Sequence, residues 1–434
     1  MYSNLYQQKL TSAENAVKAI QIGDTVIHGM LIAEPPALLK AMADRIAENN
    51  LKDINVYTLL AYHHATNSYL KPEIAKKINA NTWFVSSDDR QIVIDGYSHY
   101  VPNNFSQVPK LIEENMNVDV VMTTVSPMDK NGYFTYGTSN DYITTAARKA
   151  KIIILEVNPR MPKVHGDSLI HISDVHFVIE NQTELLEYLP NPPLPGSDII
   201  GKRIAEMVPD GATLQFGVGG IPSAVCNALT NHRHLGIHTE VFCPEMIGLI
   251  RSGAADGSRK VIHPHKHTFT IAQGNRELYD FIDNNVSVES YPVSLLNNPS
   301  IIAQQPNMIS INSTLEVDLF GQCNSEFLRN EQFTSPGGQL DFVRGAYYSP
   351  GGKSIIAFYS SAKNGTLTRV VPKLKQGGIV TVPRQDVHWL ITEYGEVNLK
   401  GKNTKERALA IIDLAAPQFR DDLIREAKEL SILK

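Results

Sequence analysis

Residues 210–245 read DGATLQFGVGGIPSAVCNALTNHRHLGIHTEVFCPE, and this stretch decides the fold class. It holds an apolar segment at 212–216, a glycine turn, a helix-forming segment behind Pro222 and a second apolar segment that ends near Glu240. The order strand, glycine turn, helix and strand predicts part of an open, mainly parallel α/β sheet. Ligands bind such sheets at the carboxyl ends of the strands, so we expect Gly217–Ile221 and Glu240 to face one site.

The same alternation of strands and helices extends along the chain. Strands are predicted at 25–28, 54–59, 83–85, 118–123, 152–157, 176–179, 355–358, 378–382 and 388–392. Helices are predicted at 12–20, 35–47, 108–115, 140–149, 406–414 and 418–430. Strands that alternate with helices favour a mainly parallel sheet.

Two pairs of segments resemble each other in the same order along the chain. GDTVIHGMLIAEPPALLKAM (Gly23–Met42) aligns with DGATLQFGVGGIPSAVCNAL (Asp210–Leu229), and VSPMDKNGYF (Val125–Phe134) aligns with INSTLEVDLFGQ (Ile311–Gln322). The repeat predicts two similar open, mainly parallel α/β domains in tandem, with chance resemblance between α/β units as the alternative.

A proline-rich segment, LPNPPLPGS (Leu189–Ser197), separates the two repeats. Such a composition favours a stiff, extended linker over a packed element. We therefore predict an N-terminal domain at 1–190, a linker at 191–197 and a C-terminal domain at 198–434.

Composition excludes several classes of protein. The 434 residues carry a net charge of -5, whereas a nucleic-acid-binding protein normally has a basic excess. The three cysteines, Cys226, Cys243 and Cys323, are far apart and form no C-x-x-C pair, which fits a reducing compartment. The first residues lack the apolar core of a signal peptide, and no apolar run reaches the length of a membrane span. We expect a cytoplasmic globular protein with no nucleic-acid or membrane partner.

Three short motifs resemble known binding signatures but depart from them. GVGGIP (217–222) has proline where a dinucleotide-binding fingerprint has glycine or alanine, and SPGGKS (349–354) lacks the leading glycine of a phosphate-binding loop. HPHKH (263–267) contains a proline that disfavours a regular strand, so a polar loop is favoured over a metal site. We expect no metal ion.

What remains is a carboxylate beside glycine loops. Glu240 follows the first loop by about twenty residues, and a second loop lies at SPGGQ (335–339). An isolated glutamate at a strand end is more often a solvated surface residue, and glycine loops are most often ordinary turns. A single acid among backbone N–H groups, with no partner base, suits covalent catalysis by a carboxylate nucleophile. The loop N–H groups would then hold the oxyanion that forms.

Nine blocks of sequence together resemble the acetyl-CoA hydrolase/transferase family, especially its 4-hydroxybutyrate and butyryl-CoA:acetate CoA-transferase branch. They are VSPMDKNGYF, LEVNPRMP, HGDSLIHISD, PDGATLQFGVGGIP, LGIHTEVF, GNRELYDFIDNN, GGQLDFVRGA, ITEYGEVNLKGK and AAPQFRDDL. The resemblance covers nearly the whole chain. It implies the CoA-transferase fold of two similar α/β domains, an active site between them, and a homodimer.

The resemblance also implies a reaction. Glu240 would attack an acyl-CoA such as acetyl-CoA, form a mixed anhydride and then a covalent glutamyl-CoA thioester, and pass CoA to a small carboxylate. The acids expected are 4-hydroxybutyrate, butyrate and acetate, with CoA as a substrate and no tightly bound cofactor. Two alternatives stay open: an acyl-CoA hydrolase that uses the same glutamate, and a non-catalytic CoA-binding module.

The resemblance assigns the remaining site residues. The expected contacts to CoA or its acyl group are Gly217, Val218, Gly219, Gly220, Ile221, Asn312, Gly337 and Gly338. The N–H of Gly338 is the expected oxyanion donor, and Lys353 and Lys400 are candidates for the CoA phosphates. Attack requires an ionised Glu240, so we expect loop N–H groups to keep its pKa from rising far. Met30 and Tyr62-His63-His64 are candidates for lining the acyl pocket, with core packing equally compatible for Met30.

Overall fold

The computed structural model describes residues 2–188 and 192–434, which form two compact units. The first unit comprises Met1–Leu189, Thr268–Leu296 and Gln332–Ser335, and the second comprises Pro190–His267, Asn297–Glu331 and Pro336–Lys434. The domain limits read from the sequence stay predictions. They give each domain one continuous range, whereas the first unit also includes two segments from later in the chain. The predicted linker begins at residue 191, outside the described residues, and residues 192–196 form no helix or strand.

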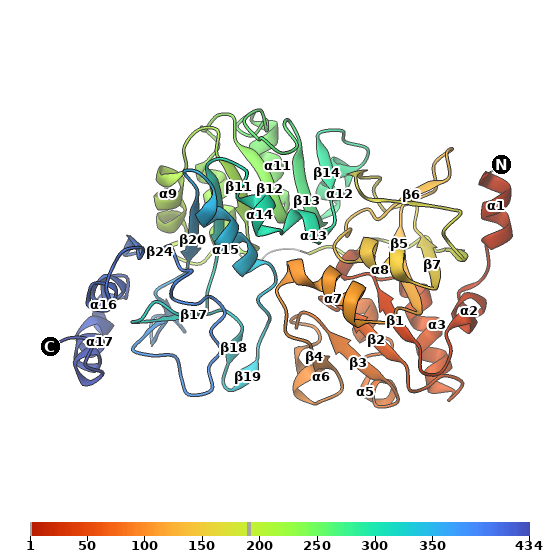
Figure 1. The fold of residues 1–434 in the computed structure, drawn as a ribbon, viewed down its shortest axis with the longest axis horizontal. Helices are drawn as coiled ribbons and strands as arrows, with labels where there is room; N and C mark the ends of the chain where they lie inside the picture. The colour runs from red at the N-terminus through yellow and green to blue at the C-terminus, as the bar shows by residue number, and fades with distance from the viewer. Residues whose placement is uncertain (1, 189–191) are drawn as a thin grey trace. The chain divides into compact units, whose positions relative to one another are not determined.

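A parallel sheet forms the core of the first unit, with strand order β10-β7-β5-β1-β2-β3-β4 (Figure 1). Its strands are β1 (Thr25–His28), β2 (Asn55–Thr58), β3 (Asn79–Thr82), β4 (His99–Tyr100), β5 (Val120–Val125), β7 (Ile152–Val157) and β10 (Phe177–Glu180). The longer helices are α1 (Tyr2–Lys9), α3 (Pro36–Ala47), α7 (Val108–Asn115), α8 (Ile143–Lys149) and α12 (Arg276–Ile282). Shorter elements are α2 (Ala13–Ala16), α4 (His63–Thr66), α5 (Pro72–Ala75), α6 (Arg90–Ile94), α13 (Val293–Leu296), β6 (Tyr133–Thr135), β8 (His165–Gly166), β9 (Leu169–His171), β13 (His267–Ala272) and β14 (Val288–Ser290).

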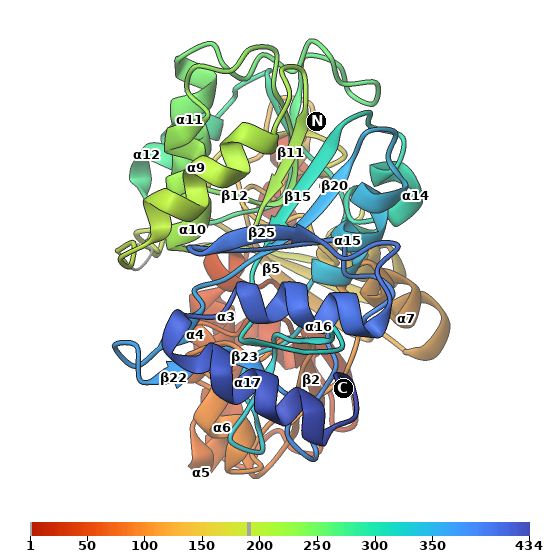
Figure 2. The same ribbon diagram turned by 90° about the vertical axis from the view of Figure 1, so that its left-hand side faces the viewer.

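The second unit is built on strands in the order β25-β24-β20-β15-β11-β12, parallel where pairing is defined except for the antiparallel edge strand β25. They are β11 (Thr213–Phe216), β12 (Gly236–Phe242), β15 (Met308–Asn312), β20 (Lys353–Ala357), β24 (Trp389–Thr392) and β25 (Gly395–Asn398). Figure 2 shows α9 (Ser197–Met207), α10 (Gly220–Ala228) and α11 (Pro244–Arg251) on one side of the strands, and α14 (Pro299–Ile302) and α15 (Gln339–Tyr348) on the other.

A smaller layer completes the second unit. The short strands β16 (Glu316–Asp318), β17 (Cys323–Asn324) and β23 (Val370–Val371) form one small sheet. Two further pairs are β18 (Phe327–Leu328) with β19 (Glu331–Gln332), and β21 (Ser361–Ala362) with β22 (Leu367–Thr368). The last helices, α16 (Thr404–Asp413) and α17 (Pro417–Glu429), bury Ile411 and Leu423 in a core shared with Val317 and Val370.

The two units share a strand order, as the sequence repeat predicts. In the first unit, β1 lies between β2 on one side and the strands β5, β7 and β10 on the other. In the second unit, β11 lies in the same way between β12 and the strands β15, β20 and β24. The glycine after that first strand makes the same bond in both units. The N–H of Gly29 donates to Met122 O at 2.9 Å, and that of Gly217 donates to Ile311 O at 2.9 Å. Equal topology and an equivalent bond support the duplication.

Most predicted elements are present within a few residues, but two predicted strands are wrong. Residues 83–85 follow β3 as a loop, although Trp83 and Val85 are buried there. Residues 378–382 form no strand, and Val382 makes only an isolated bridge to Cys323. Short apolar runs indicate burial, and burial alone does not distinguish a strand from a loop that crosses the core. Within the described part of the chain, no helix combines the length and the hydropathy that a bilayer span requires.

Candidate active site

Glu240 lies in β12, two residues before the strand ends at Phe242. Its neighbours His238 and Thr239 are fully buried, whereas Glu240 keeps part of its surface accessible. The sequence pattern predicted a carboxylate near the carboxyl end of this strand, and the structure confirms that position. The alternative of a solvated surface glutamate is wrong, because protein groups surround its carboxylate.

An asparagine that the sequence analysis did not identify contacts this carboxylate. Nδ2 of Asn297 donates to Oε2 of Glu240 at 2.5 Å. The Asn297 side chain is fully buried, and its Oδ1 atom has no hydrogen-bond partner among the described residues. Asn297 follows directly on α13 in the sequence NNP, a context typical of a turn, so nothing in the local pattern marks it as functional.

Gly338 closes the other side of the carboxylate. Its backbone N–H donates a hydrogen bond to Glu240, and the residue is the N-cap of α15. A Cβ atom at this position would lie 1.9 Å from Oε2 of Glu240 and 2.2 Å from Nδ2 of Asn297. Only glycine fits here. The structure thus brings together Glu240 and Gly338, which the resemblance paired, and adds Asn297.

Burial raises the pKa of Glu240 to about 7. The hydrogen bonds from Asn297 and Gly338 lower this pKa, and the buried Asp341 adds a repulsive contribution that raises it further. The expectation that loop N–H groups would keep this pKa from rising far is wrong, because two donors do not offset the loss of water around the anion. At neutral pH the carboxylate is therefore divided between its charged and neutral forms.

The glycine loop Gly217–Ile221 follows β11 and leads into α10. Gly219 is the N-cap of α10 with φ 132°, a backbone conformation that favours glycine, and Val218 is 40 % exposed. Because Gly219 has no side chain to cap the helix, the first N–H groups of α10 stay available to a ligand. Contact of this loop with CoA remains a prediction.

Asn312 and Gln215 form a reciprocal amide pair at the ends of two adjacent strands. Nδ2 of Asn312 donates to Oε1 of Gln215 at 3.0 Å, and Nε2 of Gln215 donates to Oδ1 of Asn312 at 3.2 Å. The expected contact between Asn312 and CoA stays a prediction. Any such contact would use an amide that Gln215 already holds in one orientation.

The two lysines proposed for the CoA phosphates make contacts within the protein. Lys353 donates from Nζ to Met207 O at 3.0 Å. Lys400 donates to Gln385 O, and its Nζ lies 3.9 Å from the centroid of the Tyr347 ring. Neither contact involves an acidic partner, and a role at the phosphates stays a prediction for both.

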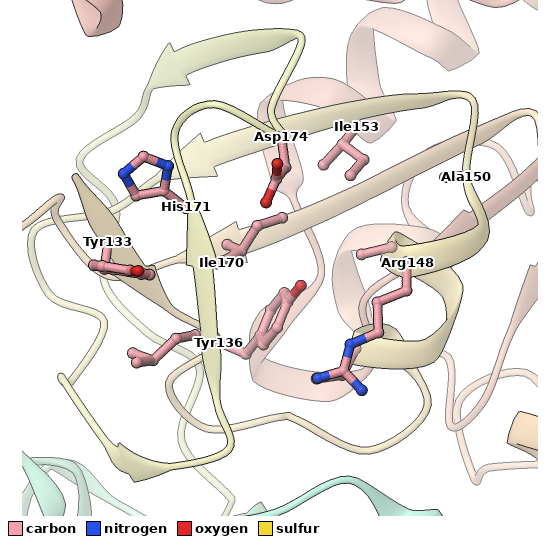
Figure 3. Close-up of a pocket in the computed structure, with 11 residues that line it drawn as sticks. Tyr133, Tyr136, Arg148, Ala150, Ile153, Ile170, His171 and Asp174 are labelled. Carbon is pink, nitrogen blue, oxygen red and sulfur yellow. The ribbon is translucent and has the colours of Figure 1, made fainter. Parts of the chain in front are cut away.

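The remaining residues suggested by the sequence are the candidates for the acyl pocket and the histidines of 263–267. Met30 is fully buried, and the Tyr62 ring stacks on His63 at 4.5 Å. The histidines of 263–267 belong to no group of three potential metal ligands within the described residues. A cavity of about 580 Å³ in the first unit is lined by residues such as Tyr136 and Arg148, shown in Figure 3, and includes no predicted site residue.

The geometry around Glu240 suits attack on a carbonyl group. One oxygen of the carboxylate accepts from Asn297, and the backbone N–H of Gly338 also donates to the group. Two fixed N–H donors on a carboxylate can hold the same oxygen as it becomes an ester-like carbonyl or a tetrahedral oxyanion. The site therefore combines a nucleophile with the donors that stabilise its adduct.

Comparison with known proteins agrees with this chemistry. The acetyl-CoA hydrolase/transferase N-terminal domain matches residues 1–190, and the C-terminal domain of the same family matches residues 274–427. The chain is 41 % identical to the succinyl-CoA:cyclohexane-1-carboxylate CoA transferase of Geobacter metallireducens, over 99 % of this chain and 97 % of that protein. It is 39 % identical to the 4-hydroxybutyrate coenzyme A transferase of Clostridium kluyveri, over 99 % of both chains.

A solved structure resembles the fold over its full length. The crystal structure of RipA from Yersinia pestis superimposes with a TM-score of 0.95, covers 100 % of both chains and is 44 % identical in sequence. Together with the two domain matches, these similarities confirm the family to which the sequence motifs pointed. The chain belongs to the acetyl-CoA hydrolase/transferase family.

Proposed function

We propose that this protein is a CoA-transferase that moves CoA from a short acyl-CoA, such as acetyl-CoA, to a small carboxylate through a thioester on Glu240. The observation that carries the proposal is the placement of the Glu240 carboxylate between the Asn297 amide and the Gly338 N–H. The CoA transferases among its relatives support the reaction class. The hydrolase alternative uses the same nucleophile and differs only in the final acceptor.

The first half of the reaction loads CoA onto the enzyme. An oxygen of ionised Glu240 attacks the acyl-CoA carbonyl, the C–S bond breaks, and CoA leaves as a thiolate. The product is a mixed anhydride between Glu240 and the acyl group. The thiolate then attacks the Glu240 carbonyl carbon, the anhydride C–O bond breaks, and the first carboxylate leaves. No proton is gained or lost.

Asn297 and Gly338 act on the glutamyl group in both steps. Their N–H groups already face the carboxylate, so they need no reorganisation when charge gathers on a glutamyl oxygen. Asn297 is fully buried, which keeps this donor from exchanging its bond for water. We assign to Gly338 the role of oxyanion donor and to Asn297 that of a second donor.

The second half returns CoA to an acid. The acceptor carboxylate attacks the glutamyl thioester, the thiolate leaves, and a second mixed anhydride forms. The thiolate then attacks the acceptor carbonyl, which releases the new acyl-CoA and restores the Glu240 carboxylate. Energy of the thioester is conserved only if water does not reach the anhydride. The names of two relatives, a 4-hydroxybutyrate coenzyme A transferase and a butyryl-CoA:acetate CoA-transferase, support 4-hydroxybutyrate, butyrate or acetate as the acid.

Further properties complete the proposal. The Gly217–Ile221 loop, Asn312 and Gly337 contact CoA, and the first N–H groups of α10 support this assignment for the loop. The enzyme works in the cytoplasm as a homodimer without a tightly bound cofactor, as its family resemblance favours. Light scattering of the purified protein measures the subunit number directly.

A trapping experiment tests the covalent step. Wild-type protein is incubated with acetyl-CoA and its mass is measured with and without hydroxylamine, alongside Glu240→Gln. We expect a CoA adduct on Glu240 that hydroxylamine removes, and no adduct in the variant. Product analysis with and without butyrate separates transferase from hydrolase. Equal CoA release without the acid, and no butyryl-CoA with it, would refute the transferase.

A further inference from the structure

Arg369 lies between two short strands of the second unit, after β22 and before β23. Its backbone is held on both sides. The N–H of Arg369 donates to Ser360 O at 2.9 Å, and its carbonyl accepts from the N–H of Val317 at 2.9 Å. The side chain therefore starts from a fixed position rather than from a free loop.

The guanidinium group of Arg369 has more donors than acceptors among the described residues. Its one hydrogen bond runs from Nη1 to Thr314 O at 3.5 Å, and its Nε atom is buried without an acceptor in the described part of the chain. Among the described residues, no carboxylate lies within ion-pair distance of it. Burial lowers the pKa of Arg369, while electrostatic interactions with Tyr359 and Glu393 raise it.

Glu393, the carboxylate that interacts electrostatically with Arg369, already has hydrogen-bond donors of its own. Glu393 acts on Arg369 only electrostatically, because its carboxylate accepts from Ser360 N at 3.0 Å and from Ser360 Oγ at 2.6 Å. A partly buried cation without a partner costs free energy unless an anion binds it. The planar fork of five N–H donors suits a carboxylate or a phosphate.

Arg369 is connected to the Glu240 site through three consecutive contacts. Its acceptor Thr314 follows Ser313, whose carbonyl accepts from Nε2 of Gln339 at 2.8 Å. Gln339 in turn follows Gly338, the residue that donates to Glu240. All these residues belong to the second unit, and Ser313 and Thr314 follow directly on the carboxyl end of β15, where α/β sheets bind ligands.

We propose that Arg369 binds an oxyanion of the substrates, either the phosphates of CoA or the carboxylate of the acid. The proposal rests on the proposed function and names a binding residue for that same site. Two lysines that the sequence suggested for the phosphates have contacts of their own, whereas Arg369 has donors without acceptors. An incoming anion would supply the hydrogen-bond acceptors that the guanidinium of Arg369 lacks.

The test compares three variants with the wild type. Arg369→Met removes the charge, Arg369→Lys keeps the charge without the fork, and Arg407→Met is the matched control. Arg407 is also a partly buried arginine bound to carbonyls, with Nη1 donating to Arg384 O at 2.8 Å and Phe320 O at 3.3 Å. Circular dichroism and thermal unfolding establish that each variant is folded.

Titration calorimetry with CoA, with pantetheine and with butyrate gives the readout without requiring turnover. Loss of a hydrogen bond to a charged group weakens binding about 10- to 100-fold, and we expect this for Arg369→Met. Weaker CoA binding with unchanged pantetheine binding assigns the phosphates; weaker butyrate binding with unchanged CoA binding assigns the carboxylate. Arg369→Lys should lose less, and Arg407→Met should lose nothing.

Unchanged binding of CoA and butyrate in folded Arg369→Met overturns the proposal. If that variant does not fold, Arg369→Lys decides in its place, since the shorter ammonium cannot bind bidentately and must still weaken one of the two ligands. Failure here is distinct from failure of the proposed function. The latter is shown by wild-type protein that forms no glutamyl adduct, whatever the titrations give.

Discussion

Nδ2 of Asn297 lies 2.5 Å from Oε2 of Glu240, and the Oδ1 atom of the same asparagine is buried without a partner among the described residues. Among the described residues, the carboxylate is thus the hydrogen-bond partner of this side-chain amide. Glu240 also receives the N–H of Gly338, which leaves no room for a side chain beside it.

The pH dependence of the reaction follows from the pKa of Glu240, which burial raises to about 7. Attack needs the ionised form, so kcat/KM for acetyl-CoA should rise with pH and level off above about 7. Below that value it should fall about tenfold per pH unit. Initial rates between pH 5 and 9, in buffers of constant ionic strength, measure the profile. A profile that is flat from pH 5 to 9 would contradict the assignment.

Asn297→Ala should move the acidic limb of this profile to higher pH, because the amide favours the ionised carboxylate. The rate at pH 7 should also fall by about 10- to 100-fold, the effect of losing a hydrogen bond to a charged group. Asn298→Ala is the matched control. Asn298 caps α14 through its side chain, so that change should lower stability by about 1 kcal/mol and leave the pH profile unshifted.

Gly338→Ala should reduce kcat by about 100-fold or more, the typical cost of losing an oxyanion donor. The added Cβ would stand 1.9 Å from Oε2 of Glu240, so the carboxylate or the loop must move. Gly248→Ala serves as the comparison. Gly248 lies in α11 with open space around it, and alanine there should leave activity unchanged and raise Tm slightly. Full activity in Gly338→Ala would contradict the close fit of this residue against Glu240.

The raised pKa of Glu240 also affects stability, with a definite sign. A carboxyl group whose folded pKa exceeds its unfolded value binds its proton more tightly in the folded state. Its favourable contribution is complete below about 4.5 and is lost as pH rises to about 7. Glu240→Gln removes this titration. The Tm of the variant minus that of wild type should therefore increase between pH 5 and pH 8, as measured by scanning calorimetry.

The amide pair of Gln215 and Asn312 predicts a separable effect on stability and binding. Asn312→Ala leaves the buried amide of Gln215 without its partner, which should cost about 1–3 kcal/mol of unfolding free energy. Gln215→Leu combined with Asn312→Leu should recover part of that loss. If Asn312 also contacts CoA, the double variant stays weak in CoA titrations. Recovery of CoA binding there would limit Asn312 to a structural role.

Much of the fold could be predicted because its signals are local. The run 213–216, the glycines after it and Pro222 specify strand, turn and helix within one short stretch. Family membership and the parallel α/β architecture followed from such blocks, and both are confirmed. The strand predicted at 378–382 failed because an apolar run records burial and not hydrogen bonding.

The site could be predicted only in part, for a different reason. Glu240 and Gly338 stand in recognisable blocks, whereas Asn297 reaches the carboxylate only through the tertiary fold, 57 positions away in sequence. The pKa of Glu240 depends on how completely protein atoms replace water around it. That quantity cannot be read from the flanking residues, and for this reason the size of the pKa rise was underestimated from the sequence.

The order in which the chain visits the two units has a consequence for making truncated or hybrid proteins. Two segments, Thr268–Leu296 and Gln332–Ser335, belong to the first compact unit. Both come after Pro190–His267, which belongs to the second unit. A protein ended at the proline-rich segment would thus be missing pieces of its own core and should expose apolar surface and aggregate. Genetic exchange between relatives at that segment would mix parts from two parents inside one folded body. Swaps that respect the three-dimensional units instead need five crossover points.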